Sequence, residues 1–322
     1  YSYSANYYLF DRETSKVQPL DEKRQPQTLA EYSPDGNQVS YIYENNIYVK
    51  NLKTGIVTEL TSDGEKNDII NGTTDWVYEE EFAFIKAYDW SPDSKYIAYL
   101  KFDERQVKEF SMTFYNELYP ESYDFKYPKA GEENSKVSVH IADIESGKEQ
   151  EIFIGQYEYI PRMEWSPSNN ELILQSMNRH QSSLKYHLVD LQGDMWESSV
   201  VFEEKSETYV DVDDNLVFLK DGNSILRTSE IDGYKHIYKL SFDGRHTQVT
   251  SGKWDVIDFL GLDTKSNTIY YSSCEPHATQ KSVYGVKVNG KNKKELTPLK
   301  GYNNAEFLKG MKYFIHTYSN AN

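Results

Sequence analysis

The feature that most constrains the fold of this chain is a turn that recurs along it, after an aromatic residue and before an alternating strand. The clearest copies begin at Tyr32, Trp90 and Trp165 and read YSPDG, WSPDS and WSPSN. Proline after serine presets the φ angle of the turn, and Asp-Gly or Ser-Asn tolerates its corner. Weaker copies begin at Phe218, Phe259 and Phe307. This recurrence predicts one structural unit that is repeated several times.

The segments around these turns are typical of short β-strands. Strands are expected at 39–43, 46–50, 96–100, 172–175 and 236–240. Several repeats end at a threonine, namely Thr61, Thr250 or Thr297. Four short strands in about 40–50 residues are typical of one blade of a β-propeller. We therefore predict an all-β propeller, with Trp90 and Trp165 in the core between neighbouring blades.

The spacing of the turns indicates two insertions. Ser33 and Ser91 are 58 positions apart, and Ser91 and Ser166 are 75 apart. A blade needs only about 40–45 residues, so extra segments are expected at about 63–87 and 103–136. Binding functions concentrate in such loops.

The first insertion contains the run TDWVYEEEF at residues 74–82. Like charges this close repel one another, so the three acids Glu79–Glu81 are unfavourable without a cation. Trp76, Val77 and Phe82 can bury one side of a short helix and leave the acids on the other. Two interpretations are open: a solvated helix face, which is the usual role of an acidic run, or a site for a protonated amine, whose donors suit two carboxylates.

Several motifs resemble the N-terminal β-propeller domain of the dipeptidyl peptidase IV family of serine peptidases. They are the stretch from 68 to 82, LYPE at 118–121, FKYPKAGE at 125–132 and SEIDGYKHIY at 229–238. In that family the second and third acids of the run hold the free N-terminus of the substrate. The resemblance therefore favours the amine-binding interpretation and implies substrate binding by Glu80 and Glu81.

The resemblance also implies the organisation of the protein. Residues 1–322 would supply about six blades' worth of an eight-bladed propeller, with the acidic substrate-binding helix in 63–87. The segment 103–136 would form an arm that takes part in a homodimer. In the family an α/β-hydrolase domain comes next, and its Gly-x-Ser-x-Gly elbow is absent from this sequence. We therefore expect no catalytic residue in this chain and no activity of the chain alone. An arginine that binds substrate in the family would fall just before Tyr1.

The predicted function is that of the propeller region of a serine exopeptidase. The intact enzyme would release Xaa-Pro or Xaa-Ala dipeptides from peptides with a free N-terminus. Two alternatives remain: a related tripeptidyl aminopeptidase, or a stand-alone propeller that binds a partner protein.

Charge and cysteine content narrow the class of protein further. The net charge of -16 argues against nucleic acid as a partner, and one cysteine excludes an intramolecular disulfide. Animal members of the family bear disulfides, so we expect a bacterial relative that is periplasmic, secreted or on the cell surface. Cys274 lies in a strand-like run, residues 270–274, and is expected to be buried.

The sequence contains no signal for a cofactor site or a membrane helix. No stretch approaches the ~18 apolar residues of a membrane helix. No Cys/His cluster suggests a metal and no Gly-rich loop suggests a nucleotide, so no cofactor is expected. None of the seven histidines has a local Ser–Asp partner set that would suggest a catalytic triad, and most are expected to be ordinary strand or loop residues.

Overall fold

A computed structural model describes residues 4–167, 171–193 and 195–321. These residues form strands and connecting loops, with a single helix, α1 (Trp76–Glu81). Within the described part of the chain, no helix has the length and apolar character needed to cross a membrane. The chain divides into two compact units. Unit 1 comprises Tyr1–Trp165, Asn170–Leu172 and Val189–Ser198, and unit 2 comprises Ser166–Asn169, Ile173–Leu188 and Ser199–Asn322.

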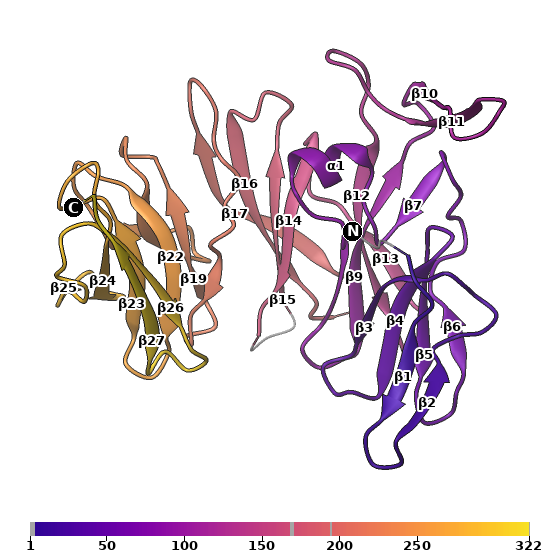
Figure 1. Ribbon diagram of the computed structural model, residues 1–322, viewed down its shortest axis with the longest axis horizontal. Coiled ribbons are helices and arrows are strands. Elements are labelled where there is room, and N and C mark those ends of the chain that lie inside the picture. The colour runs from indigo at the N-terminus through magenta and orange to yellow at the C-terminus, as the bar shows by residue number, and fades with distance from the viewer. Residues whose placement is uncertain (1–3, 168–170, 194, 322) are drawn as a thin grey trace. The chain divides into compact units, whose positions relative to one another are not determined.

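Unit 1 is built around two antiparallel sheets (Figure 1). The first has the order β3 (Thr28–Tyr32), β4 (Gln38–Tyr43), β5 (Asn46–Asn51), β6 (Val57–Glu59). The second has the order β13 (Glu149–Ile152), β12 (Lys136–Asp143), β9 (Tyr96–Asp103), β7 (Ile69–Asn71), and β8 (Tyr88–Trp90) also pairs with β9. Two hairpins accompany them, β1 (Tyr8–Asp11) with β2 (Lys16–Pro19), and β10 (Glu109–Phe114) with β11 (Glu121–Lys126).

The later strands form further sheets in which strands that follow one another in the chain are paired. One contains β14 (Tyr159–Trp165), β15 (Glu171–Met177), β16 (Ser183–Asp190) and β17 (Glu197–Lys205). The next contains β18 (Val217–Phe218), β19 (Ser224–Ser229), β20 (His236–Ser241) and β21 (His246–Gln248). The last two contain β22 (Val256–Asp263), β23 (Thr268–Ser273), β24 (Ser282–Lys287) and β25 (Lys294–Glu295), and then β26 (Tyr302–Phe307) and β27 (Phe314–Ser319).

The predicted turns mostly join the first two strands of a sheet. In the β3–β4 turn the Ser33 hydroxyl donates to Asp35 at 2.6 Å, and in the β8–β9 turn Ser91 donates to Asp93 at 2.7 Å. The third turn comes after β14, and its positions 168 and 169 lie outside the described residues. The prediction at Phe259 is wrong, because that residue lies within β22 and the turn comes after the strand ends.

The threonines at the ends of repeats share one role. Each hydroxyl oxygen accepts the backbone N–H of a residue near the start of the strand beside it, at 2.8–2.9 Å. The pairs are Thr61 with Ile47, Thr250 with Ile237, and Thr297 with Val283. A threonine side chain thus repeatedly satisfies a buried backbone donor that would be costly to leave unpaired.

The two predicted core tryptophans each contact a strand of another sheet, and both residues belong to unit 1. Trp90 packs in a cluster with residues of β4, β5, β8 and β9, and its indole N–H donates to Ser40 on β4 at 2.8 Å. The indole N–H of Trp165 donates to the carbonyl of Asp89 on β8 at 3.1 Å. Both side chains are buried, so the prediction of core positions between sheets is confirmed.

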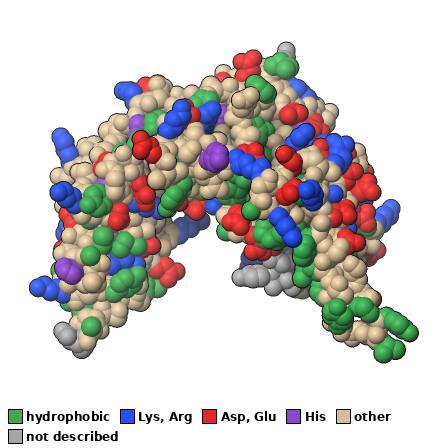
Figure 2. Space-filling model, turned by 90° about the horizontal axis from the view of Figure 1, so that it is seen from above, with side chains coloured by type: hydrophobic (Ala, Val, Ile, Leu, Met, Phe, Trp, Pro, Cys, Tyr) green, Lys and Arg blue, Asp and Glu red, His purple; other side chains and the backbone are tan. Residues whose placement is uncertain are grey.

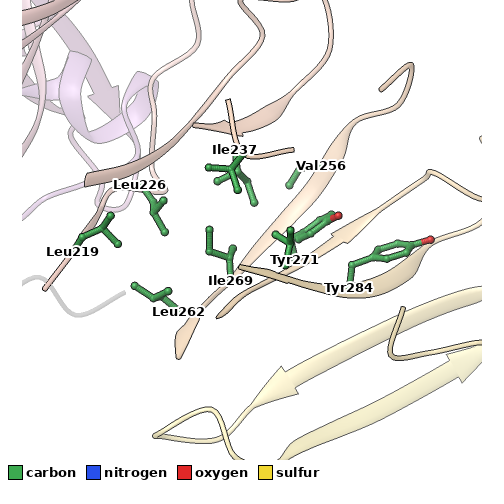
Figure 3. Packing of buried hydrophobic residues seen from close by; sticks show 10 residues of the cluster. Leu219, Leu226, Ile237, Val256, Leu262, Ile269, Tyr271 and Tyr284 are labelled. Carbon is green, nitrogen blue, oxygen red and sulfur yellow. The ribbon is translucent and has the colours of Figure 1, made fainter. Parts of the chain in front are cut away.

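Unit 2 has an apolar core between the sheet of β18–β21 and the sheet of β22–β25 (Figure 3). Its labelled members are Leu219, Leu226, Ile237, Val256, Leu262, Ile269, Tyr271 and Tyr284. Cys274 lies directly after β23 and is only half-buried, so the expectation of a buried thiol is wrong. The strand ends one residue earlier and leaves the cysteine in the loop after it.

Unit 2 also contains a buried ionic cluster. Arg227 has a relative exposure of 1%. Its guanidinium donates to Glu204 and lies 3.6 Å from Asp213. The aromatic ring of Tyr186 lies 4.6 Å from the guanidinium carbon. Both acids are buried as well, so the cation compensates carboxylates that have been removed from water.

Candidate functional site

The acidic run forms a short helix because its first turn is capped. Asp75 has an extended backbone with φ -77° and ψ 178°, and its carboxylate accepts the N–H of Tyr78 at 3.0 Å. This is the usual N-cap interaction of aspartate. The chain leaves the helix through Ala83, whose φ of 58° is left-handed, as is common after a helix C-terminus.

The loop that carries α1 is closed at its base. The Thr73 hydroxyl donates to the carbonyl of Ile85 at 3.0 Å, and the Thr74 hydroxyl donates to that of Phe84 at 3.1 Å. These hydrogen bonds pair the segment before α1 with the segment after it, which continues into β8.

The buried side of α1 is partly the one expected from the sequence. Val77 and Phe82 are buried as predicted, whereas Trp76 is only half-buried. The main anchor is Tyr78, which the sequence interpretation missed. Its ring packs against Phe102 at 4.8 Å, and its hydroxyl accepts the N–H of Ile160 at 2.8 Å. The helix pattern places Tyr78 one turn before Phe82, and this spacing could have identified it.

The three acids differ in exposure. Glu80 and Glu81 are exposed, while Glu79 is half-buried. Within the described residues, none of the three has a hydrogen bond or an ion pair to a side chain. Two adjacent carboxylates thus face solvent without a neutralising cation, which is the arrangement that an amine-binding site needs. Their role in substrate binding stays a prediction.

A second pair of acids, Asp75 and Glu104, is buried in unit 1. The other carboxylate oxygen of Asp75 accepts the hydroxyl of Ser135 at 2.6 Å, and burial raises the pKa of Asp75 despite its hydrogen bonds. Burial also raises the pKa of Glu104 to about 7, with a further contribution from the charge of Asp75 and an opposing one from Lys126.

The second insertion forms the hairpin of β10 and β11, which extends beyond the sheet that it interrupts (Figure 1). Facing residues of the two strands give it an apolar face and a polar face. The apolar face carries Phe110, Met112, Phe114, Tyr123 and Phe125. Hydrophobic side chains gather on this projection at the lower right of Figure 2. We call residues 103–136 the arm and this hairpin its ribbon.

One histidine, His140, has both a serine and an acid within hydrogen-bonding distance. The ring of His140 lies 2.9 Å from the hydroxyl of Ser138 through Nε2 and 2.9 Å from the carboxylate of Glu149 through Nδ1. The sequence does not reveal this trio because Glu149 lies on the next strand, diagonally across from His140. Glu149 also accepts the hydroxyl of Tyr99 at 2.6 Å, and the Tyr99 ring stacks on His140 at 5.2 Å.

The trio is explained by its place in the sheet. Its members lie on β12 and β13, and Tyr99 comes from the neighbouring β9, so the contacts form a cross-strand network. A serine nucleophile also needs donors for the oxyanion. The ammonium group opposite Ser138 belongs to Lys101, which is already paired with Asp63. We therefore assign the trio a structural role. Among the described residues, no group of His, Cys, Asp and Glu is arranged to hold a metal ion.

The comparison with protein families decides the identity of the chain. Residues 1–322 match the model of the dipeptidyl peptidase IV (DPP IV) N-terminal region. The chain belongs to the dipeptidyl peptidase IV family.

Curated relatives in this family are named as dipeptidyl peptidases. The chain is 30% identical to a probable dipeptidyl peptidase 4 of Arthroderma benhamiae, over 100% of this chain and 43% of that protein. It is also 30% identical to a probable dipeptidyl-aminopeptidase B of Talaromyces marneffei, over 99% of this chain and 39% of that protein. The chain therefore spans less than half the length of these dipeptidyl peptidase IV relatives.

Solved structures support the fold. The crystal structure of Porphyromonas gingivalis dipeptidyl peptidase 4 matches with a TM-score of 0.89 and 34% identity, over 99% of this chain and 46% of that one. A putative dipeptidyl aminopeptidase IV from Bacteroides ovatus matches with a TM-score of 0.76 at 23% identity, and it supports the fold alone. The predicted all-β propeller class of the dipeptidyl peptidase IV N-terminal region is confirmed. A bacterial origin stays a prediction.

Proposed function

We propose that this chain is the non-catalytic propeller region of a serine exopeptidase that releases Xaa-Pro and Xaa-Ala dipeptides. The observation that carries the proposal is the two-sided helix α1. One side is anchored by buried Tyr78, and the other exposes Glu80 and Glu81 without a partner among the described side chains. An ammonium group has three N–H donors, which suit two neighbouring carboxylates.

Binding the amine would set the length of the product. With the ammonium group held at Glu80 and Glu81, only a fixed number of residues fits between it and the nucleophile of a C-terminal hydrolase domain. The α-amino group has an ordinary pKa of about 8, and nearby carboxylates favour its protonated form. An internal peptide bond or an acetylated terminus offers no such cation and is rejected.

Kinetics of the full-length protein test this proposal. Glu80→Ala and Glu81→Ala should each lower kcat/KM for a free Xaa-Pro substrate by about 30-fold to several thousand-fold, since losing one partner of a charge pair costs about 2–5 kcal/mol. Glu79→Ala is the matched control and should have a much smaller effect, because adjacent helix residues point about 100° apart. Equal losses in all three variants would contradict the assignment.

N-terminal acetylation of the substrate provides a second readout. It should abolish cleavage by the wild-type protein and add little further loss in the Glu80/Glu81 double variant. A double variant that still distinguishes free from acetylated substrate would place amine recognition elsewhere. The 322-residue chain alone should hydrolyse neither substrate, because it has no nucleophile elbow.

The arm is proposed to contact a second subunit. The exposed apolar face of its ribbon supports this role, since large apolar surfaces usually mark interaction sites. Replacing residues 109–126 by a short turn should weaken the dimer of the full-length protein in sedimentation experiments, and an unchanged dimer would rule the arm out. Free peptides as substrates suit a periplasmic, secreted or cell-surface location.

The same ribbon favours a second candidate function, that of a stand-alone propeller which binds a partner protein. The two candidates differ in the segment C-terminal to the propeller in the full-length protein. A Gly-x-Ser-x-Gly elbow with an aspartate and a histidine after it would support the peptidase. An open reading frame without them would support the partner-binding propeller.

A further inference from the structure

The two insertions of unit 1 meet at helix α1. The Ser135 hydroxyl at the end of the arm donates to Asp75, the N-cap of the helix, at 2.6 Å. The ring of Tyr127, just after the ribbon, packs on that of Trp76 with centroids 4.3 Å apart. Residues about 50–60 positions away in the sequence thus hold the first turn of the acidic helix.

The arm also reaches the other end of the helix. The amide of Asn134 donates to the hydroxyl of Tyr159 at 3.0 Å. The ring of Tyr159 in turn packs on Phe82 at 5.2 Å, and Phe82 directly follows Glu81. The return strand of the arm is therefore connected to both ends of α1.

We infer that the base of the arm positions the acidic helix, with Ser135 and Tyr127 as positioning residues for Glu80 and Glu81. The inference rests on the proposed function of those two carboxylates as the site of the substrate amine.

A helix of this length needs such support. Isolated helices shorter than about 12–15 residues are marginal in water, and α1 has 6 residues. Its first turn depends on Asp75, one of whose oxygens accepts the Tyr78 N–H while the other accepts the Ser135 hydroxyl. Without the Ser135 hydroxyl, a buried carboxylate oxygen of Asp75 loses its donor. The Asp75 side chain is then expected to rotate away from the N-cap position to find another donor.

The support is itself fixed within the arm. The side-chain amide of Gln106 donates to the carbonyls of Asp103 and Asn134, both at 3.0 Å, and the Tyr127 N–H donates to the carbonyl of Lys108 at 3.0 Å. The two ends of the arm are thus joined where they touch α1. A displacement of the arm at its base is transmitted to the cap of the helix and to the carboxylates that it carries.

The test compares Ser135→Ala and Tyr127→Leu with the wild type in the full-length protein. Hydrogen exchange of a peptide covering residues 74–84 should become about tenfold faster in each variant. Ser135→Ala removes a hydrogen bond to a charged group, and Tyr127→Leu removes the aromatic contact with Trp76. The KM for a free Xaa-Pro substrate should rise about tenfold with kcat within twofold, because amine binding is lost equally in the ground and transition states. Ser135→Thr keeps the hydroxyl and should restore both values.

Ser91→Ala is the matched control. Ser91 also donates to an aspartate, at 2.7 Å, but in the β8–β9 turn at the opposite end of the same sheet. This variant should leave the exchange of residues 74–84 and the KM within twofold of the wild type. Equal effects of Ser91→Ala and Ser135→Ala would show general destabilisation and overturn the inference.

The experiment separates this inference from the proposed function. Unchanged exchange at 74–84 in Ser135→Ala and Tyr127→Leu overturns positioning, whatever the kinetics show. Faster exchange with an unchanged KM, in a protein where Glu80→Gln does raise KM, overturns it as well. If Glu80→Gln leaves KM unchanged, the proposed function fails, and the exchange data still decide whether the arm holds the helix.

Discussion

Two acidic regions of this protein are built in opposite ways. In unit 2, Glu204 and Asp213 are buried around Arg227. In unit 1, Glu80 and Glu81 stand exposed on α1 with no cation among the described side chains. Removing a carboxylate from water is expensive unless a cation or hydrogen bonds replace the water. The buried acids meet that requirement within the protein, whereas the exposed acids stay hydrated and available to a ligand.

The difference shows how to separate structural from functional acids in a chain that contains 51 of them. An acid that has found its cation inside the fold serves stability. An acid can also be held in place by buried neighbours while it remains unpaired itself. Such an acid makes no contribution to the stability of the fold that would explain its position. Substitutions at Arg227, at Glu104 and at the exposed acids test this distinction.

The largest expected effect is at Arg227. Arg227→Met fills the same space but leaves two buried carboxylates without their cation, which should lower the free energy of unfolding by about 3–5 kcal/mol. Denaturant unfolding measures the loss. Arg245, an exposed arginine paired with Asp243, is the control, and Arg245→Met should cost less than about 1 kcal/mol. Similar losses in the two variants would remove the contrast between buried and exposed acids.

Glu104 is an intermediate case, because it is buried and forms no ion pair among the described residues. Burial raises its pKa from 4.5 to about 7, so between these pH values the folded state binds more protons than the unfolded state. Stability therefore falls as pH rises through this window, by about 3 kcal/mol in total at about 1.4 kcal/mol per pKa unit.

Glu104→Gln removes that contribution. The difference in unfolding free energy between variant and wild type should grow in favour of the variant from pH 4.5 to 7 and stay constant above it. Unfolding measured across this range checks the result. A constant difference at all pH values would show that Glu104 is hydrated in the folded protein.

The sequence predicted the sheets better than it predicted the contacts between segments. Serine-proline turns and alternating strands are local signals, and they located β4, β5, β9 and β20 and the tryptophans between sheets. The acids at Glu80 and Glu81 were likewise visible in one run. The spacing of Tyr78 and Phe82 indicates that both can share the buried side of α1, but the partners Phe102 and Ile160 lie far along the chain and were not predictable from it.

Features that depend on strand register or on the ends of strands were not predicted. The Ser138–His140–Glu149 network depends on the register between two strands, and the site of Cys274 depends on where β23 ends. The link from Ser135 to Asp75 joins two insertions whose folded paths the repeat spacing does not specify. Contacts of this kind arise from three-dimensional packing, which a local pattern does not encode.

The threonines at the ends of repeats test whether a neutral side chain can stabilise the fold as much as a charged one. Thr61→Val keeps the shape but leaves the N–H of Ile47 without its acceptor, which should cost about 1–3 kcal/mol. Thr250→Val and Thr297→Val should behave alike, since each breaks the same contact. Thr58→Val in strand β6, where the residue is exposed, is the control for the substitution. Chemical denaturation of the four variants gives the comparison.

The smallest expected effect is at the exposed acids themselves. The double variant with Glu80→Gln and Glu81→Gln should change the free energy of unfolding by less than about 0.5 kcal/mol, as is usual for surface positions. Because the substitutions relieve repulsion between adjacent charges, we expect a slight increase in the free energy of unfolding. A decrease of about 2 kcal/mol or more in the free energy of unfolding would mean that the acids have structural partners. It would argue against a role in ligand binding.

The ribbon of the arm also has a consequence for proteolysis. Its tip presents Tyr115, Leu118 and Tyr119 with relative exposures of 79%, 89% and 80%, and exposed loop tips are where peptide bonds are cut first. A protease that cleaves after aromatic residues should therefore nick the chain there while the paired strands on either side keep the fragments together. If the full-length protein forms the proposed dimer, the bonds that become resistant in the dimer would show which part of the ribbon is covered.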